Sequence, residues 1–216
     1  MIETHFIERD AAYYDRIYEE GYSTASYAPV YEAVIDFLLR MPDPRVLEVG
    51  CGIGDLAARI CLEKIPYRGF DVSPVAIDQC RTHGVRGVSI GSAYDARMYA
   101  PKDFNVIVAL EVFEHIDDLR AIAKFPRDLH VLFSVPDFVE TSHLRAYQDP
   151  QSDIVEYYAG QMAVGGILPF TFESEAGTLL TIYLAHAVVG DGPCTNPLAR
   201  TTTSEISETT EPASSH

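Results

Sequence analysis

The stretch "VLEVGCGIGDL", residues 46–56, carries the clearest structural information in the chain. It begins with an apolar segment interrupted only by Glu48, and glycines follow at positions 50, 52 and 54. Glycine lets the backbone turn tightly and approach a ligand closely, so the pattern predicts a buried strand that leads through a tight loop into a helix. The N–H groups at the start of such a helix have no partner within it and are available to a ligand.

The residue after the third glycine narrows the choice of ligand. A loop that binds a dinucleotide has the spacing G-x-G-x-x-G, and here Asp55 occupies the position of the last glycine. Its negative charge is unfavourable beside a pyrophosphate, and Glu48 adds a carboxylate just before the loop. The loop therefore favours a ligand with a cationic or hydroxyl-rich part; a tight turn that binds nothing is the alternative.

An acidic residue ends the next predicted strand. Asp71 lies in "GFDVSP", 21 positions after Gly50. At the carboxyl end of the second strand it lies beside the glycine loop, where a carboxylate accepts hydrogen bonds from both hydroxyls of a ribose. Asp71 as a helix cap is the alternative, but Ser73 is better placed to cap, with Pro74 at the first helical position.

Strands and helices alternate on either side of these segments. The strands are expected at residues 45–50, 67–72, 87–93, 104–113 and 130–136, and the helices at 55–64, 73–84, 119–125 and 150–160. Continuous apolar strands in such an alternation predict a mainly parallel sheet with helices on both faces. Residues 167–175 and 178–189 follow as a hairpin around Gly177, which adds an antiparallel edge.

The composition divides the chain into three parts. Residues 1–40 are expected to form an N-terminal helical lid, because "DAAYYDRIYEEGY" and "APVYEAVIDFLLR" are amphipathic and "MPDP" then breaks the helix. Residues 41–190 form the α/β core. In residues 191–216 Ser, Thr, Glu and Pro dominate and the apolar periodicity stops, which predicts a disordered acidic tail.

Charge and cysteine content exclude several classes of partner. The chain has 216 residues and a formal net charge of −16, so it lacks the basic excess with which proteins bind a phosphate backbone. Its four cysteines include no C-x-x-C pair, so they predict neither a zinc site nor a disulfide framework. The N-terminus lacks a basic start and an apolar run, and no apolar stretch is long enough to span a membrane. We therefore expect a cytoplasmic protein, monomeric or homodimeric, without nucleic-acid or membrane partners and without a bound metal.

Three segments together resemble the motifs of the class I S-adenosylmethionine-dependent methyltransferases. "VLEVGCGIGDLA" is similar to their first motif, E/D-x-G-x-G-x-G, and "GFDVSPVAIDQCR" to the second. "FNVIVALEVFEHIDD" is similar to their fourth-strand motif, often written E-x-L-E-H. The resemblance covers residues 45–138. It implies a Rossmann-like, doubly wound mixed sheet of seven strands with the last one antiparallel, and S-adenosylmethionine as the cofactor, converted to S-adenosylhomocysteine.

The same resemblance assigns the methionine end of the cofactor to the glycine loop and the fourth strand. It implies that Glu48 orients the loop and lies near the cofactor amino group. The backbone of Gly50, Gly52 and Gly54 is expected to line the methionine moiety, and Glu111 to border it.

The nucleoside end is assigned to the second and third strands. By resemblance, Asp71 holds the ribose and Val72 packs on the adenine. In "IGSAYDA" the family often has an Asp after the Gly, where this chain has Ser92. The contact with the adenine amine therefore falls to Ser92, to the backbone around Ala93, or to Asp95.

Two histidines are candidates for the chemistry. An activated methyl donor needs alignment and exclusion of water, and a general base only where the acceptor starts protonated. His115 follows the fourth strand and His143 lies in the loop after the fifth; an imidazole suits proton transfer near neutral pH. His115 as a residue that orders its own loop beside Glu114 or Asp117, and His143 in an ordinary surface loop, are the alternatives.

Candidate acceptor contacts lie in the same loop and in the lid. Arg145 could pair with a carboxylate or phosphate of the acceptor. Aromatic rings surround a cationic sulfonium or amine favourably, and Tyr14, Tyr18, Tyr22 and Tyr27 are the candidates in the lid. Core packing is the alternative for each of these tyrosines.

Three functions compete at this point. The first is methyl transfer to oxygen or nitrogen of a small-molecule acceptor, such as a sugar, an amino acid derivative or a natural-product intermediate, because no separate substrate domain is evident. The second is methylation of a macromolecule. RNA is disfavoured by the acidic charge and by "EVFEHIDD" in place of an N-P-P-Y-type motif, but protein is not. The third is a cofactor-binding interaction subunit without activity.

Overall fold

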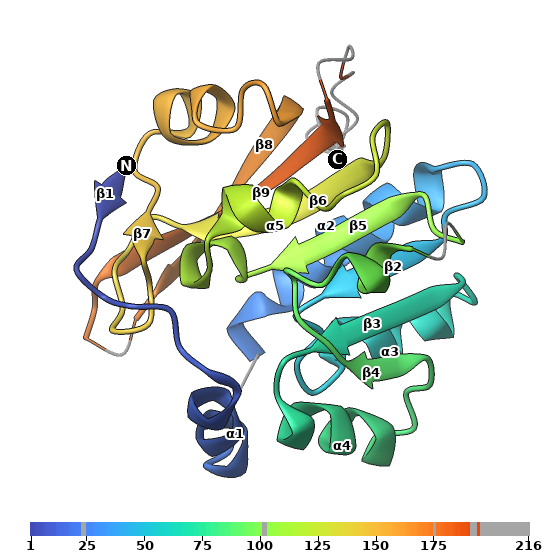
Figure 1. Ribbon diagram of the computed structural model, residues 1–216. Helices are drawn as coiled ribbons and strands as arrows, with labels where there is room; N and C mark the ends of the chain where they lie inside the picture. The colour runs from blue at the N-terminus through green and yellow to red at the C-terminus, as the bar shows by residue number, and fades with distance from the viewer. Residues whose placement is uncertain (23–24, 101–102, 175, 191–193, 195–216) are drawn as a thin grey trace, which may run out of the picture.

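A seven-stranded mixed sheet forms the centre of the protein (Figure 1). The computed structural model describes residues 1–22, 25–100, 103–174, 176–190 and 194. The strands of the sheet are β2 (Val46–Val49), β3 (Tyr67–Asp71), β4 (Val88–Ile90), β5 (Val106–Leu110), β6 (His130–Pro136), β8 (Met162–Glu173) and β9 (Leu179–Val189). Their order is β4-β3-β2-β5-β6-β9-β8. β2 to β6 are parallel and β9 is antiparallel to both of its neighbours, as the sequence predicts.

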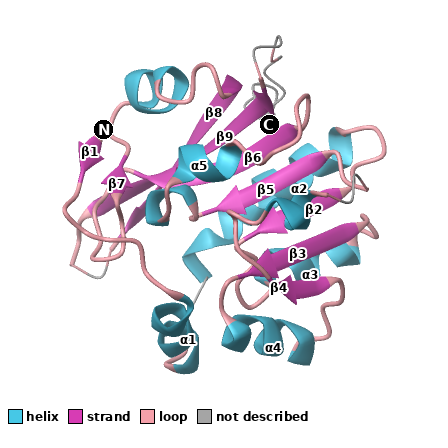
Figure 2. Cartoon of the chain, in the orientation of Figure 1, coloured by secondary structure: helices cyan, strands magenta, loops and turns pink. Residues whose placement is uncertain are grey.

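Helices cover both faces of this sheet (Figure 2). The α-helices are α1 (Ala11–Glu19), α2 (Ala28–Arg40), α3 (Asp55–Leu62), α4 (Pro74–Thr82) and α5 (Asp118–Ile122). Short turns of 3-10 helix are η1 (Ala25–Tyr27), η2 (Ala96–Tyr99) and η3 (Phe113–His115), and η4 (Pro150–Glu156) is a π-helix. A separate two-stranded sheet pairs β1 (Ile2–Glu3) with β7 (Arg145–Ala146). No helix in the described part of the chain is long and apolar enough to cross a membrane.

Alternate residues of the central strands pack on opposite faces. Val46, Val108 and Leu132 contact the side of the sheet that α2 and α3 cover. The odd-numbered neighbours, such as Leu47 and Phe133, pack on the side of α5 and η4. Side chains of a strand point alternately to its two faces, so an apolar residue at nearly every position produces a sheet that is buried on both sides.

Several strands and helices begin or end a few residues away from their predicted bounds. The strand predicted over 104–113 ends at Leu110, because Glu111 adopts a φ of +52° that no strand can continue. Ser73 caps α4 as predicted, since its hydroxyl accepts a hydrogen bond from the N–H of Ala76 at 3.0 Å. The predicted turn at Gly177 has a φ of +77°. The predicted tail falls outside the described residues except for Cys194.

The structure divides the N-terminal forty residues differently from the sequence prediction. α2 buries Val30, Val34, Phe37 and Leu38 against the sheet and therefore belongs to the core. α1 buries no residue completely and lies over the carboxyl edge of the sheet, held at α4. The difference arises because both helices are amphipathic, and an apolar helical face alone does not say which surface it will cover.

A buried network around Asp118 joins η3, α5 and the segment after β6. The carboxylate of Asp118 is fully buried and forms an ion pair with Arg145 at 2.6 Å. It also accepts hydrogen bonds from the hydroxyls of Tyr147, Tyr157 and Tyr158 at 3.2, 3.0 and 2.7 Å. The guanidinium also reaches the carbonyl of Ile116 at 3.3 Å, so the network fixes the end of the turn that follows β5.

Removing the carboxylate of Asp118 should destabilise the protein strongly. Asp118→Ala leaves a half-buried guanidinium and three phenol hydroxyls without their acceptor, and we expect the free energy of unfolding to fall by about 3–5 kcal/mol. Asp36→Ala removes the exposed partner of Arg40 and is the control, with an expected loss below about 0.5 kcal/mol. Urea unfolding measures both, and equal losses would contradict the role given to the network.

Candidate functional site

The glycine loop connects β2 to α3 in a conformation that only glycine adopts easily. Gly50, Gly52 and Gly54 have φ angles of +70°, +52° and +91°. The amides of Gly50 and Cys51 both donate to the carbonyl of Phe70 at the end of β3, at 2.9 and 3.1 Å. A Cβ on Gly50 would lie 2.6 Å from a methyl group of Val112, so the loop also packs closely on the segment after β5.

Asp71 fixes this loop to the end of β3. Its carboxylate accepts hydrogen bonds at 2.9 Å from the amide of Gly52 and at 2.9 Å from the amide of Ser73. Burial raises the pKa of Asp71, and these two backbone donors oppose the shift by favouring the ionised form. Each carboxylate oxygen receives one donor and so retains capacity for another, which suits a ligand with two neighbouring hydroxyls.

Glu48 lies at the other side of the loop. It is 4% exposed on β2, and the hydroxyl of Tyr67 donates to it at 2.6 Å. Burial raises the pKa of Glu48 to about 8. A buried carboxyl with one neutral partner favours a cationic ligand group beside it, because such a group would compensate the charge that burial disfavours.

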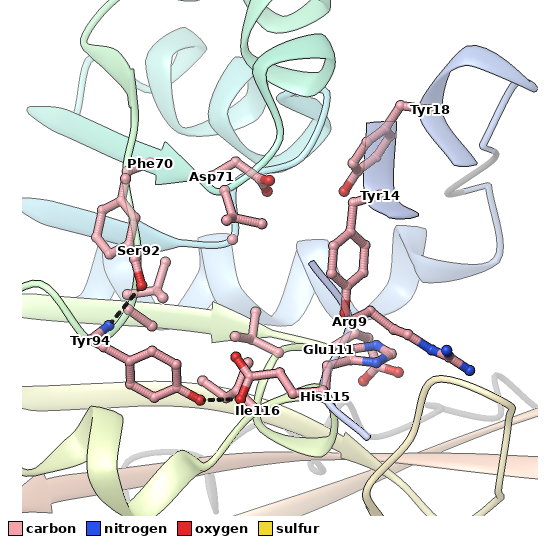
Figure 3. Close-up of a pocket in the computed structure, with 17 residues that line it drawn as sticks. Arg9, Tyr14, Tyr18, Phe70, Asp71, Ser92, Tyr94, Glu111, His115 and Ile116 are labelled. Carbon is pink, nitrogen blue, oxygen red and sulfur yellow. Dashed lines mark hydrogen bonds between the residues drawn. The ribbon is translucent and has the colours of Figure 1, made fainter. Parts of the chain in front are cut away.

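The segments that follow β3 and β4 supply the opposite wall. Val72, Ser92 and Ala93 all line one cleft with Asp71. The hydroxyl of Ser92 accepts a hydrogen bond from the amide of Tyr94 at 3.2 Å (Figure 3). Asp95, the other candidate for a base contact, is held by Arg97 at 2.6 Å and does not line this cleft.

Glu111 directly follows β5, which lies between β2 and β6 in the sheet. Its positive φ, with the amide donating to the hydroxyl of Ser134 at 2.9 Å, turns its side chain away from the line of β5. The same hydroxyl donates to its carboxylate at 2.7 Å, and burial raises the pKa of Glu111 to about 7. A non-glycine residue in this backbone region is strained, and such strain concentrates at functional sites.

Three connected hollows meet at this edge of the sheet. The main cleft encloses about 680 Å³ including its open mouth, and it contains Asp71, Ser92 and His115 (Figure 3). The loop cleft lies between Glu48, the glycine loop and Tyr31. The tyrosine pocket, about 660 Å³, lies between the lid and the segment after β6. Tyr18 and Glu111 line all three hollows.

Residues 11–22 and 25–27, called the lid from here on, contribute aromatic side chains to these hollows. Tyr14 and Tyr18 extend from α1 into the main cleft and the tyrosine pocket (Figure 3). Tyr22 and Tyr27 line the loop cleft and the tyrosine pocket. α1 is positioned by Asp15, whose carboxylate accepts from the hydroxyl of Ser73 at 2.5 Å and from the amide of Val75 at 3.2 Å. The lid is therefore attached to the residue that caps α4, next to Asp71.

The two histidines meet in the tyrosine pocket. The ring centroids of His115 and His143 are 4.9 Å apart, with the rings nearly perpendicular. Burial, with His143 close by, lowers the pKa of His115 to about 4, and burial also lowers the pKa of His143. Both imidazoles are thus neutral at physiological pH and line a pocket that opens beside Glu111.

Like Asp95, Arg145 is a predicted site residue that lies apart from the hollows. Its guanidinium is held by Asp118 and lines none of the three. The loop position suggested an acceptor contact, but β7 pairs with β1 and directs this side chain toward the buried network.

Two residues at the site, Tyr94 and Glu114, were not predicted from the sequence. Tyr94 spans the main cleft, donating to Glu8 at 2.6 Å and accepting from the amide of Asp117 at 2.8 Å. Glu114 is completely buried beside His115. The second glutamate of "EVFEHIDD" was the available signal for Glu114, whereas nothing in the sequence marks Tyr94.

The comparison with known families agrees with this geometry. The sequence model of the family described as "Methyltransferase domain" matches residues 25–161, more than half of the chain. The chain therefore belongs to this family and, with the sheet order and site above, to the class I S-adenosylmethionine-dependent methyltransferases. The cofactor of this class, and so of this chain, is S-adenosylmethionine.

Individual relatives are similar over part of their length or in fold alone. A ubiquinone biosynthesis O-methyltransferase of Vibrio cholerae serotype O1 is 32% identical over 100 residues, which are 42% of this chain and 41% of the relative. The chain therefore matches less than half the length of this relative.

Solved structures share the fold at low identity. The magnesium protoporphyrin IX methyltransferase of Synechocystis PCC 6803, with bound S-adenosylhomocysteine, has a TM-score of 0.57 at 16% identity over 81% of this chain and 92% of its own. A [4+2]-cyclase has a TM-score of 0.64 at 13% identity, covering 84% and 95%. One fold thus carries more than one reaction, and the function has to be argued from the site.

Adding a methyl group to Gly54 should destabilise the loop. Gly54→Ala places a Cβ inside the contact distance of the Cys80 thiol and also strains a φ of +91°. Gly84→Ala is the matched control, because Gly84 has a φ of +86° and an added Cβ would meet nothing within 4 Å. We expect both to lose about 1–2 kcal/mol from backbone strain in urea unfolding, and Gly54→Ala to lose more. Equal losses would mean that the contact with Cys80 is unimportant.

The raised pKa of Glu48 predicts a loss of stability as the pH rises. A carboxyl whose pKa is higher in the folded than in the unfolded state stabilises the fold when protonated, below the unfolded value of 4.5. That stability is lost progressively as the pH rises toward the folded value of about 8. Glu48→Gln keeps an acceptor for Tyr67, but its free energy of unfolding should lack this dependence on pH. Unfolding free energies measured across this range should diverge between the two proteins, and parallel curves would refute the shift.

Proposed function

We propose that the protein transfers a methyl group from S-adenosylmethionine to an oxygen or nitrogen atom of a small-molecule acceptor. The observation that carries this proposal is the continuity of the main cleft with the tyrosine pocket. Both are lined by Tyr14, Tyr18, Glu111 and His115. A donor in one and an acceptor in the other would meet at this shared boundary.

The residues of the main and loop clefts fit the cofactor. The two free acceptor positions of Asp71 suit the ribose hydroxyls, with Val72, Ser92 and Ala93 against the adenine. The methionine end would lie on the backbone of Gly50, Gly52 and Gly54, with its ammonium group near the buried carboxyls of Glu48 and Glu111. When bound, the cofactor supplies an electrophilic methyl group on a sulfonium.

The chain's own residues orient the acceptor and exclude water. Tyr14, Tyr18, Tyr22 and Tyr27 enclose the pocket from the lid side, and aromatic faces stabilise a nearby positive charge. His115 and His143, both neutral, face the acceptor and can accept the proton or hydrogen bond of its nucleophilic group. No Lys or Arg lines the tyrosine pocket in the described part of the chain, and Glu111 and Glu140 do, so an anionic acceptor is disfavoured.

The proposal is tested by a screen of acceptors with detection of the added mass of one methylene unit. Hydroxylated and amine-bearing small molecules and a protein lysate should be compared with S-adenosylmethionine present. We expect a product from the small molecules. Methylation of proteins alone would replace the proposed acceptor class, and failure to bind S-adenosylmethionine in calorimetry would remove the proposal altogether.

Replacing Asp71 should weaken cofactor binding. Asp71→Ala removes the acceptor assigned to the ribose, and two charge-assisted hydrogen bonds correspond to about 2–4 kcal/mol. Asp78→Ala removes an exposed carboxylate from α4, leaves the cleft unchanged and is the control. Calorimetric titration with S-adenosylmethionine measures both, and a dissociation constant unchanged by Asp71→Ala would refute the ribose assignment.

A further inference from the structure

Three potential metal ligands converge beside the tyrosine pocket, and two of them line it. Glu114 and His115 belong to η3, and His143 comes from the segment after β6. Each offers one ligand atom, and the three atoms lie within 4.8 Å of one another. The cysteine spacing predicted no metal site, and the fold brings His143 to the consecutive residues Glu114 and His115.

Hydrogen bonds to the backbone orient both imidazoles. The Nδ1 atom of His115 lies 3.0 Å from the carbonyl oxygen of Ser142, and that of His143 lies 3.0 Å from the carbonyl oxygen of Phe138. A carbonyl oxygen only accepts, so both Nδ1 atoms carry the proton. Both Nε2 atoms then keep a free lone pair. In metal-binding histidines, a hydrogen bond made by the other ring nitrogen fixes the tautomer and the ring orientation in the same way.

The carboxylate of Glu114 lacks a conventional partner. It is 0% exposed, and among the described residues neither oxygen accepts a hydrogen bond from the backbone or a neutral side chain of another residue, so its own backbone amide is the one such donor nearby. The titratable groups around it include the carboxyls of Glu111 and Asp118, Nε2 of His115 at 3.7 Å, and His143. A buried carboxylate without compensation is costly, and a cation at this point would compensate it.

We propose that Glu114, His115 and His143 bind one divalent transition-metal ion through a carboxylate oxygen and two Nε2 atoms. Two imidazoles and one carboxylate are a ligand set of catalytic Zn²⁺ sites, which keep a further position open. The open position faces the tyrosine pocket, since His115 and His143 both line it. The metal site is inferred from the geometry alone. The role of the ion in methyl transfer rests on the proposed function.

The site selects a hydroxyl group as the acceptor. A metal ion lowers the pKa of a bound hydroxyl, whose proton leaves to solvent while the oxygen retains lone pairs. One of these pairs forms the new O–C bond as the C–S bond breaks, and its electrons stay on sulfur, which becomes a neutral thioether. An amine bound in the same way has no lone pair left for the methyl group. The two histidines then act on the acceptor through the ion rather than directly.

Metal binding is tested on the full chain after removal of metals with a chelator. Titration with Co²⁺, followed by its visible absorption, should show one saturable site per chain, from which Zn²⁺ displaces it. Glu114→Gln and His143→Ala should each weaken Co²⁺ binding at least about tenfold. His130→Ala is the control, because His130 and His186 form a second histidine pair, 2.9 Å apart, away from the clefts. Absence of saturable binding, or binding lost only in the control, would overturn the proposal.

A measurement on the unaltered protein covers the case in which a variant fails to fold. Addition of Zn²⁺ should shift the imidazole ¹⁵N resonances of two histidines at Nε2, and no such shift would overturn the proposal. The calorimetric affinity for S-adenosylmethionine checks the folding of each variant.

Methylation assays with and without chelator separate this inference from the proposed function. Activity that the chelator abolishes and Zn²⁺ or Co²⁺ restores supports the metal role, whereas activity unaffected by the chelator overturns it and leaves methyl transfer standing. Metal binding without methylation of any acceptor would leave the ion site standing and remove the proposed function.

Discussion

Four carboxyl groups lie at the carboxyl edge of this sheet, three of them buried and that of Glu111 partly exposed in the clefts, and the cost of removing them from water constrains the residues around them. Burial raises the pKa of all four, which are Glu48, Asp71, Glu111 and Glu114. Each has a different form of compensation. Asp71 receives two backbone amides, Glu48 a phenol hydroxyl and Glu111 a serine hydroxyl. Among the described residues, Glu114 receives no hydrogen bond from the backbone or a neutral side chain of another residue.

This constraint links the backbone of the site to its electrostatics. The amide of Gly52 is directed at Asp71 because the glycine loop follows a left-handed path, and the same path places the loop against Val112. Glu111 in turn needs its own unusual backbone conformation to reach Ser134. Burial disfavours the ionised form of these carboxyls and a nearby positive charge stabilises it, so this edge of the sheet favours a cationic cofactor and a cationic metal ion.

The lid and the segment after β6 complete the site from opposite directions. β1 pairs with β7, so the start of the chain is joined to the strand just beyond His143. α1 is attached at the other end through Asp15 to the first turn of α4. The side chains of Tyr14 and Tyr18 on α1 therefore lie across the junction of the main cleft and the tyrosine pocket.

The sequence by itself determined the local parts of this protein. Apolar strands, the positions of the three glycines, Asp71 at a strand end and the capping pair Ser73 and Pro74 are all short-range patterns, and they predicted the sheet, the loop and a ribose contact. The resemblance of three motifs to a known family implied the cofactor. The tertiary structure decided what depends on contacts between distant segments. It placed α2 in the core rather than the lid, paired Arg145 with Asp118, and brought His143 to His115 beside Glu114. An amphipathic face or a lone histidine has many possible partners in a chain, and only the packing of the whole fold selects one.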